Sequence, residues 1–161
     1  MTAPIRLAAG AADMAEARAL FEEYAAWLAI DLGFQNFADE LATLPGAYAP
    51  PAGRLLLAGE PGAAVGCIAV RPLALADAPA GTVGEVKRMY VKPAARGEGL
   101  GARLVERLVE EARAIGYRTL MLDTLGTMHA AQALYRRFGF AGCSPYYENP
   151  VPGVVYMRRV L

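Results

Sequence analysis

The sequence predicts an α+β domain in which helices flank a mixed central β-sheet. Two apolar runs joined by the turn residues Glu60 to Gly62 predict a β-hairpin, and with it an antiparallel part of the sheet. An apolar strand at 85–91, an amphipathic helix at 99–116 and a second strand at 117–124 predict a right-handed crossover, so these two strands should lie parallel. A mixed sheet with helices on its faces belongs to the α+β class.

The first half of the chain supplies two helices and the hairpin. Apolar side chains recur at helical spacing from Met14 to Leu28, and Gly33 breaks this helix. In chain order, the expected elements are a strand at 5–8, helices at 11–29 and 37–44, a turn-rich loop at 45–53 and the hairpin at 54–73.

The second half adds the crossover and the last strand. Pro93 ends the strand at 85–91 because proline has no N–H to donate to a neighbouring strand. The helix that follows presents leucine and alanine at helical spacing on one face and charged side chains on the other, and it ends at Gly116. A further helix at 128–140 and a strand at 154–160 complete the expected elements.

Composition limits the domain number and the class of partner. The 161 residues, 55% of them hydrophobic, suffice for the core of one domain, which we expect to span residues 1–161. Sixteen basic and sixteen acidic side chains cancel, so no strong net field draws the protein to nucleic acid or to anionic membranes. Cys67 and Cys143 fit neither a metal site nor a disulfide framework. No apolar run approaches the ~20 residues that span a bilayer. We therefore expect a cytoplasmic protein without a metal.

The segment RGEGLG, residues 96–101, lies between a strand and an amphipathic helix. At a helix start several backbone N–H groups have no intrahelical acceptor, and the helix dipole adds roughly half a positive charge. Glycine reaches positive φ and leaves room for an anion against the backbone. Arg96 adds a permanently charged, forked donor. These features predict a pyrophosphate site; the plainer alternative is a turn between strand and helix.

Two classes of pyrophosphate ligand compete for this loop. Gly97, Gly99 and Ala102 match the dinucleotide-binding pattern G-x-G-x-x-[GA], and Asp123 near the end of the next strand could bind a ribose. Against this interpretation, five residues separate the strand from the first glycine, as KPAAR. A dinucleotide fold also needs several strand–helix–strand units, and the sequence predicts only one. The nicotinamide interpretation is therefore weak.

A second motif favours another class. Arg96, Gly99 and Gly101 form R-x-x-G-x-G, and Leu134 to Phe140 form L-Y-x-x-x-G-F one strand and one helix later. The two motifs in this order resemble the GNAT superfamily of acyl-CoA N-acyltransferases. The resemblance implies the GNAT fold and acetyl-CoA as cosubstrate, with its pyrophosphate on the glycine loop and its pantetheine arm along the preceding strand. The coenzyme contacts that it implies are Met89, Tyr90, Val91, Arg96, Gly97, Glu98, Gly99, Leu100 and Gly101.

The resemblance also implies a catalytic acid. Tyr135 in the second motif would lie beside the coenzyme sulfur and protonate the departing thiolate. The alternative is an aromatic core residue of an amphipathic helix. A free backbone N–H on a bulged strand, between Met89 and Val91, would stabilise the developing oxyanion.

Glu85 begins the strand that leads toward the acyl group and is a candidate general base, acting directly or through water. The competing interpretation is a carboxylate in solvent or paired with Lys87 or Arg88. Strict alternation puts Glu85, Lys87 and Met89 on one face and Val86, Arg88 and Tyr90 on the other, unless a bulge intervenes.

The acceptor site is expected where two loops meet. In GNAT folds the connection between the first two helices, here residues 31–37, and the loop before the last strand, here 145–153, commonly border the acceptor. Tyrosine suits such a pocket because it combines an apolar ring with a polar tip. The candidate contacts are Phe34, Gln35, Tyr146, Tyr147 and Glu148, with an ordered surface loop as the alternative. Glu148 would favour a cationic acceptor.

One position departs from the family pattern. Met128 occupies a place that often holds an asparagine, which weakens one expected coenzyme contact. Its neighbour His129 can titrate near pH 7, although a surface role at the helix start is the plainer interpretation.

The function that the resemblance implies is transfer of an acetyl group from acetyl-CoA to a primary amine of a small molecule or peptide. Neither cysteine lies in a nucleophile pattern, which favours direct attack over a covalent enzyme intermediate. The alternative is a non-catalytic acyl-CoA-binding or regulatory domain. A dimer is common for this fold, and a homodimer stays an open alternative.

Overall fold

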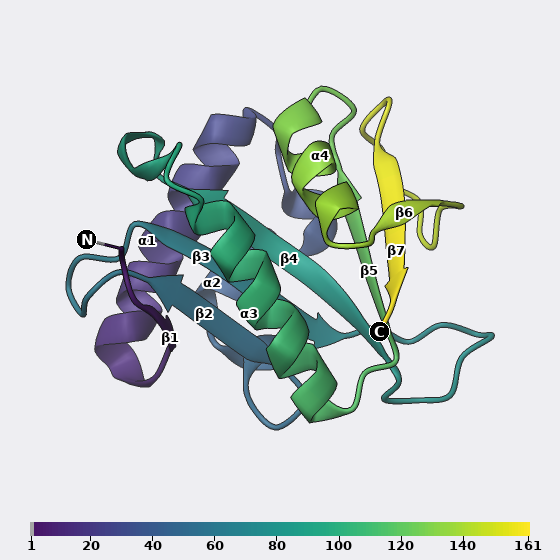
Figure 1. Ribbon diagram of the computed structural model, residues 1–161, viewed down its shortest axis with the longest axis horizontal. Helices are drawn as coiled ribbons and strands as arrows, with labels where there is room; N and C mark the ends of the chain where they lie inside the picture. Colours follow the sequence, from purple (N-terminus) through teal and green to yellow (C-terminus); the bar gives the residue numbers. More distant parts are fainter. Residues whose placement is uncertain (1) are drawn as a thin grey trace.

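A seven-stranded mixed sheet forms the centre of the protein in the computed structural model, which describes residues 2–161 (Figure 1). The strands are β1 (Ile5–Leu7), β2 (Arg54–Ala58), β3 (Gly66–Pro72), β4 (Val83–Val91), β5 (Thr119–Thr124), β6 (Ala141–Cys143) and β7 (Val155–Val160). Their spatial order is β1-β2-β3-β4-β5-β7-β6. The hairpin pair β2 and β3 is antiparallel and the crossover pair β4 and β5 is parallel, so both pairings expected from the sequence are confirmed.

Helices cover both faces of this sheet (Figure 1). The helices are α1 (Gly10–Leu28), α2 (Phe37–Ala42), α3 (Leu100–Ile115) and α4 (His129–Arg137), with short 3-10 turns η1 (Gly33–Gln35), η2 (Gly46–Tyr48) and η3 (Pro93–Ala95). α3 and α4 pack on one face, and α1 and α2 pack on the other. No helix within residues 2–161 is long and apolar enough to cross a membrane.

The hairpin strands are buried on both faces because they lie between the two helical layers. Along β2, Leu55 and Leu57 pack against α1, whereas Leu56 and Ala58 pack against α3. Side chains alternate across a strand, so a strand covered on both sides must be apolar throughout. The run RLLLA meets this requirement and anchors the strands that carry the site.

β4 and β5 are paired only along their first residues and then separate. Their pairing ends at Glu85 and Met121, although β4 continues to Val91 and β5 to Thr124. The far ends of the two strands therefore leave an opening in the middle of the sheet. This opening, absent from any pattern in the sequence, positions the site described below.

A bulge in β4 changes which side chains face the opening. Cys67 pairs with Tyr90 while Ala69 pairs with Lys87, so Ile68 alone faces two residues of β4. Arg88 adopts φ +60° at this point. Strict alternation is therefore wrong beyond Lys87. Side chains on the α1 and α2 face are Glu85, Lys87, Arg88 and Tyr90, and those on the α3 face are Val86, Met89 and Val91.

The remaining differences from the sequence prediction lie at element ends. β6 was not expected, because its three residues, AGC, are too few to carry an alternating pattern. β4 begins at Val83, two residues before the expected start, because Gly84 pairs with both Pro72 and Leu120.

Candidate active site

Three adjoining spaces, which share lining residues, lie along the opening between β4 and β5. The first, which we call the glycine-loop groove, measures about 750 Å³ and lies between the end of β4, residues 96–102 and the start of α4. The second, the waist, measures about 60 Å³ and lies between the parted strands. The third, the tyrosine cavity, measures about 500 Å³ and lies between η1, α2 and the loop at 144–154. The waist shares Met89 with the groove and Lys87 with the cavity.

The glycine-loop groove presents unsatisfied backbone donors. No acceptor among the described residues bonds the amides from Gly97 to Ala102. Gly97 and Gly99 have φ of +86° and +76°, and a Cβ at either would meet nothing within 4 Å. Free amides at the start of a 16-residue helix form an anion-binding surface, and the glycines keep it open.

Arg96 is held in place beside this surface. Its Nε donates to the Val91 carbonyl oxygen over 2.9 Å, and its guanidinium carbon lies 4.8 Å from the centre of the Trp27 ring and 5.7 Å from that of Tyr90. Such cation–π contacts contribute about 0.5–1 kcal/mol each at exposed sites. Trp27 is 46% exposed at the rim of the groove and did not follow from the sequence motifs.

The residues expected to contact the coenzyme come together here, with one exception. Met89, Tyr90, Val91, Arg96, Gly97, Gly99, Leu100 and Gly101 all line the groove. Glu98 is exposed and does not line the groove. His129 and Met128 also line the groove, at the start of α4.

Tyr135 lines the waist from α4. Its side chain is 7% exposed, and its ring packs edge-on against Phe140 with 5.7 Å between ring centres. Burial raises the pKa of the Tyr135 hydroxyl, so this group stays protonated at neutral pH and can donate a proton. A second tyrosine, Tyr24 of α1, lines the same space, and burial raises its pKa to about 12.

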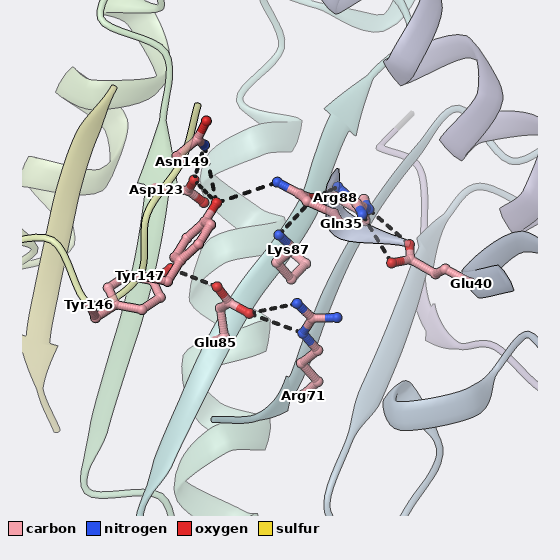
Figure 2. Close-up of polar contacts among 10 residues, drawn as sticks. All are labelled: Gln35, Glu40, Arg71, Glu85, Lys87, Arg88, Asp123, Tyr146, Tyr147 and Asn149. Carbon is pink, nitrogen blue, oxygen red and sulfur yellow. Dashed lines mark hydrogen bonds and ion pairs between the residues drawn. The ribbon is translucent and has the colours of Figure 1, made fainter. Parts of the chain in front are cut away.

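Glu85 lies in the wall of the tyrosine cavity and is 2% exposed (Figure 2). Arg71 of β3 forms an ion pair with its Oε1 over 3.0 Å, and the Tyr146 hydroxyl donates to its Oε2 over 2.7 Å. The expectation that Glu85 would pair with Lys87 or Arg88 is wrong. Because β3 and β4 are antiparallel neighbours, the residue opposite Glu85 is Arg71.

Gln35 of η1 joins two cations of β4 (Figure 2). Its Oε1 accepts from Lys87 Nζ over 2.9 Å and from Arg88 over 2.8 Å. Arg88 also forms a buried ion pair with Glu40 of α2, with contacts of 2.8 and 2.9 Å. This bidentate pair ties α2 to the bulge and supports the left-handed backbone at Arg88, a conformation that costs roughly 1–2 kcal/mol in isolation.

The loop at 144–154 closes the other side of the cavity (Figure 2). The Tyr147 hydroxyl donates to Asp123 of β5, and Asn149 Nδ2 donates to the same carboxylate over 2.8 Å. Four of the expected acceptor contacts, Phe34, Gln35, Tyr146 and Tyr147, line the cavity. Glu148 does not: its side chain is exposed, because its neighbours on both sides turn inward.

The chain was compared with known proteins. The model of the acetyltransferase (GNAT) family matches residues 14–140. The chain belongs to the GNAT family. An uncharacterised N-acetyltransferase of Schizosaccharomyces pombe is 44% identical over 149 residues, which cover 91% of this chain and 87% of that protein. The IAA acetyltransferase of Azospirillum brasilense is 44% identical over 115 residues, 70% of this chain and 71% of that protein.

A GNAT-family acetyltransferase of Elizabethkingia anophelis, solved with acetyl-CoA bound, shares the fold. Its TM-score is 0.55 at 20% identity, over 68% of this chain and 77% of that one. As a GNAT-family protein, the present chain is an acetyl-CoA-dependent N-acetyltransferase. The dinucleotide alternative is wrong, because β4 and β5 form the only parallel strand pair in residues 2–161 and the sheet has no second crossover of the kind that alternative requires.

Several residues of this GNAT site escaped the sequence analysis. Arg71 and Glu40 line the tyrosine cavity and Asn149 lines the waist, each from an element distant in sequence. Lys87 was considered only as an ion-pair partner of Glu85. Two adjacent cations inside a strand whose other residues are apolar except for Glu85 were the available signal, because buried cations need partners or a function. No cluster of metal-binding side chains occurs in the part of the chain that the structure describes.

Proposed function

We propose that this GNAT-family enzyme transfers the acetyl group to a primary amine of a small molecule or peptide by direct attack within the waist. The observation that carries the proposal is the arrangement of the three spaces. The waist, which contains Tyr135, adjoins the groove with the free amides on one side and the tyrosine cavity on the other. Two substrates that enter from opposite ends would therefore meet in the waist, beside Tyr135.

The glycine loop binds the pyrophosphate of acetyl-CoA in this proposal. The amides from Gly97 to Ala102 are the donors, and Arg96 adds a positive charge held by Trp27 and Val91. The side chains of Met89 and Leu134 border the route from the loop to the waist. The loop thus aims the thioester at the opening between β4 and β5.

Tyr135 acts as the general acid. Its hydroxyl is protonated at neutral pH because burial raises its pKa, and it lies in the narrowest part of the passage. The amine nitrogen forms the new bond to the acetyl carbon, the C–S bond breaks, and the hydroxyl proton goes to the departing sulfur. Backbone N–H groups at the bulge between Lys87 and Tyr90 stabilise the negative oxygen.

The amine must lose a proton before it attacks, and two acceptors compete for that proton: Glu85 and a water molecule. Both oxygens of Glu85 already accept from Arg71 and Tyr146. This occupancy supports water as the immediate proton acceptor and a positioning role for Glu85, which holds Tyr146 against the cavity.

The two cysteines support direct attack, because neither is available as a thiolate nucleophile. Burial raises the pKa of Cys67 to about 12, and its Sγ donates to the Arg88 carbonyl oxygen. Cys143 lines none of the three spaces. A thiolate nucleophile is therefore not offered to the thioester.

Release of free CoA thiol from acetyl-CoA, measured against a panel of primary amines, tests the proposal. We expect amine-dependent release and formation of the acetylamide in equal amounts. Binding of acetyl-CoA without release for any amine would support a non-catalytic coenzyme-binding domain instead. An acetylated cysteine that passes its acetyl group to amine would contradict direct attack.

A further inference from the structure

Two ionised side chains in the waist have no partner of opposite charge. Of the charged residues that line it, Arg88 is paired with Glu40. Lys87 and Asp123 form no ion pair with any residue from 2 to 161. Lys87 is 6% exposed, and a buried ammonium without a counter-charge is costly. The waist therefore contains one cation and one anion that no ion pair within the protein neutralises.

Lys87 and Asp123 lie on opposite sides of the opening. The last paired residues of β4 and β5 are Glu85 and Met121, so the same register continued by two residues places Lys87 across from Asp123. Residues paired in this way project to the same side of a sheet. Because the strands have parted, a gap separates the two charges, and it opens on one side to the tyrosine cavity.

Each of these groups has free hydrogen-bonding capacity. An ammonium has three N–H donors, and Gln35 Oε1 accepts from one of those on Lys87. Asp123 accepts from Tyr147 and Asn149 at Oδ2 alone, and no donor among the described residues bonds its Oδ1. The first group suits a carboxylate and the second suits an ammonium.

We propose that the acceptor is an amino acid, whose carboxylate binds the Lys87 ammonium and whose amino group binds Asp123 before it is acetylated. This inference rests on the proposed function and names its acceptor. Both charges flank the waist, so the carboxylate and the reacting nitrogen must be close together in the acceptor, as in an α- or β-amino acid. The amino-acid side chain occupies the tyrosine cavity of about 500 Å³ beside Phe34 and Tyr146.

The step balances without a further reactant. The bound ammonium first gives one proton to water, and the nitrogen lone pair then forms the N–C bond as the C–S bond breaks. The departing sulfur takes a proton from Tyr135, and the second proton lost by the nitrogen restores the Tyr135 hydroxyl. The products are an N-acetylamino acid and CoA thiol. Acetylation removes the positive charge that Asp123 binds, so the product loses one of its two ionic contacts and is released.

The other cation of the tyrosine cavity is less suited to this role. Arg71 forms a closed pair with Glu85, with its Nε and one terminal nitrogen both directed at the same carboxylate oxygen. A substrate carboxylate at Arg71 would have to displace Glu85 from an ion pair, whereas the Lys87 ammonium forms no ion pair that must first be broken.

The first experiment uses the wild-type enzyme with matched acceptors. Steady-state CoA release is measured for the twenty L-amino acids, for their α-amides and for the corresponding decarboxylated amines. We expect kcat/KM to be at least about tenfold higher for the preferred amino acid than for its amide, because a charge-assisted hydrogen bond contributes ~1.5–3 kcal/mol. The amide is a stringent comparison because its α-amino group is less basic than that of the amino acid. A larger fraction of it is neutral, so without a carboxylate site the amide would be the faster substrate. Equal or faster turnover of the amides would overturn the proposal.

The second experiment assigns the two charges. Lys87→Met should raise KM for the amino acid at least about tenfold and lower kcat/KM for the amide by a clearly smaller factor, because the amide carbonyl accepts a hydrogen bond but carries no charge. Lys87→Arg keeps the charge and should preserve the preference for the carboxylate. Asp123→Asn keeps an acceptor for Tyr147 and should raise KM for both substrates, because both carry the amino group. Equal loss with amino acid and amide in Lys87→Met would assign Lys87 to proton transfer and contradict the proposal.

Lys92→Met is the matched control, because Lys92 follows β4 but lines none of the three spaces. It should leave the amino acid to amide ratio unchanged. Thermal unfolding and acetyl-CoA affinity, measured for each variant, report whether the fold is intact. Absence of CoA release with every amine would refute the proposed function itself, whereas turnover of amines irrespective of a carboxylate would refute this inference alone.

Discussion

Lys87 Nζ donates to Gln35 Oε1 over 2.9 Å, and this neutral amide oxygen is the hydrogen-bond partner found for the ammonium within residues 2–161. Burial lowers the pKa of Lys87 from 10.5 to about 8. The charged groups that face it are Arg71, Glu85, Arg88 and Asp123. Their attraction and repulsion do not offset the cost of burying the charge.

The pKa of Lys87 implies that the enzyme is less stable at neutral pH than it would be without this charge. The unfolded chain keeps the Lys87 proton between pH 8 and 10.5 while the folded chain loses it, so stability rises with pH across this interval. Lys87→Met should therefore stabilise the protein at pH 7 by about 3 kcal/mol, an upper estimate, and the gain should vanish above about pH 10.

Urea unfolding of wild type and Lys87→Met between pH 6 and 10 measures this difference. Lys92→Met, whose side chain is partly exposed, should show no comparable gain. A Lys87→Met variant less stable than wild type at pH 7 would show that the ammonium is compensated in the fold, and would weaken the inference that it awaits a substrate anion.

Gly99 should matter more for coenzyme affinity than for folding. Its φ of +76° makes alanine strained, at roughly 1–2 kcal/mol, and the new methyl group would project into open space at the helix start. Gly99→Ala should weaken acetyl-CoA binding at least about tenfold by calorimetry, because the methyl occupies the place of a phosphate.

Gly81 offers a matched control for this substitution. It has the same φ of +76°, and a Cβ there also meets nothing within 4 Å, but it lies in the loop before β4. Gly81→Ala should lower stability by a similar amount and leave acetyl-CoA affinity intact. Equal affinities for the two variants would point to a turn role for the glycine loop.

Tyr135→Phe should reduce kcat by ~10²-fold, the usual contribution of one acid–base group. The ring packs against Phe140, and this packing does not depend on the hydroxyl, so the variant should keep its fold and its acetyl-CoA affinity. Tyr24→Phe removes the other tyrosine hydroxyl of the waist and provides the comparison. A large loss of kcat at Tyr24 with none at Tyr135 would reverse the assignment of the acid.

Glu85→Gln separates a positioning role from a basic one. Gln cannot pair ionically with Arg71, and we expect a rise in the acceptor KM with less than about a threefold change in kcat, together with a stability loss of about 1–3 kcal/mol. A fall in kcat of ~10²-fold, with loss of the acidic limb of the pH–rate profile, would identify Glu85 as the general base. Glu111→Gln, which breaks an ion pair with Arg54 outside the three spaces, should leave both kinetic constants unchanged.

Local patterns accounted for much of the fold and for one end of the site. The glycine loop from Arg96 to Gly101 is a contiguous segment, so its free amides and its place at a helix start could be predicted from neighbouring residues alone. Tyr135 could be placed because its motif is also contiguous. The acceptor end was only partly predictable: Tyr146 and Tyr147 line the cavity, whereas Glu148 between two inward-facing neighbours points to solvent.

The sequence by itself determined the mixed sheet, the crossover and the anion-binding loop, because hydrophobic periodicity, glycine and proline act over a few neighbouring residues. Only the tertiary structure decided that Arg71 pairs with Glu85, that the bulge at Arg88 turns this residue toward Glu40, and that Lys87 faces Asp123 across the parted strands. These relationships depend on strand register and on where β4 and β5 separate. Register is set by packing between distant segments, and a shift of one residue would move every side chain of a strand to the opposite face.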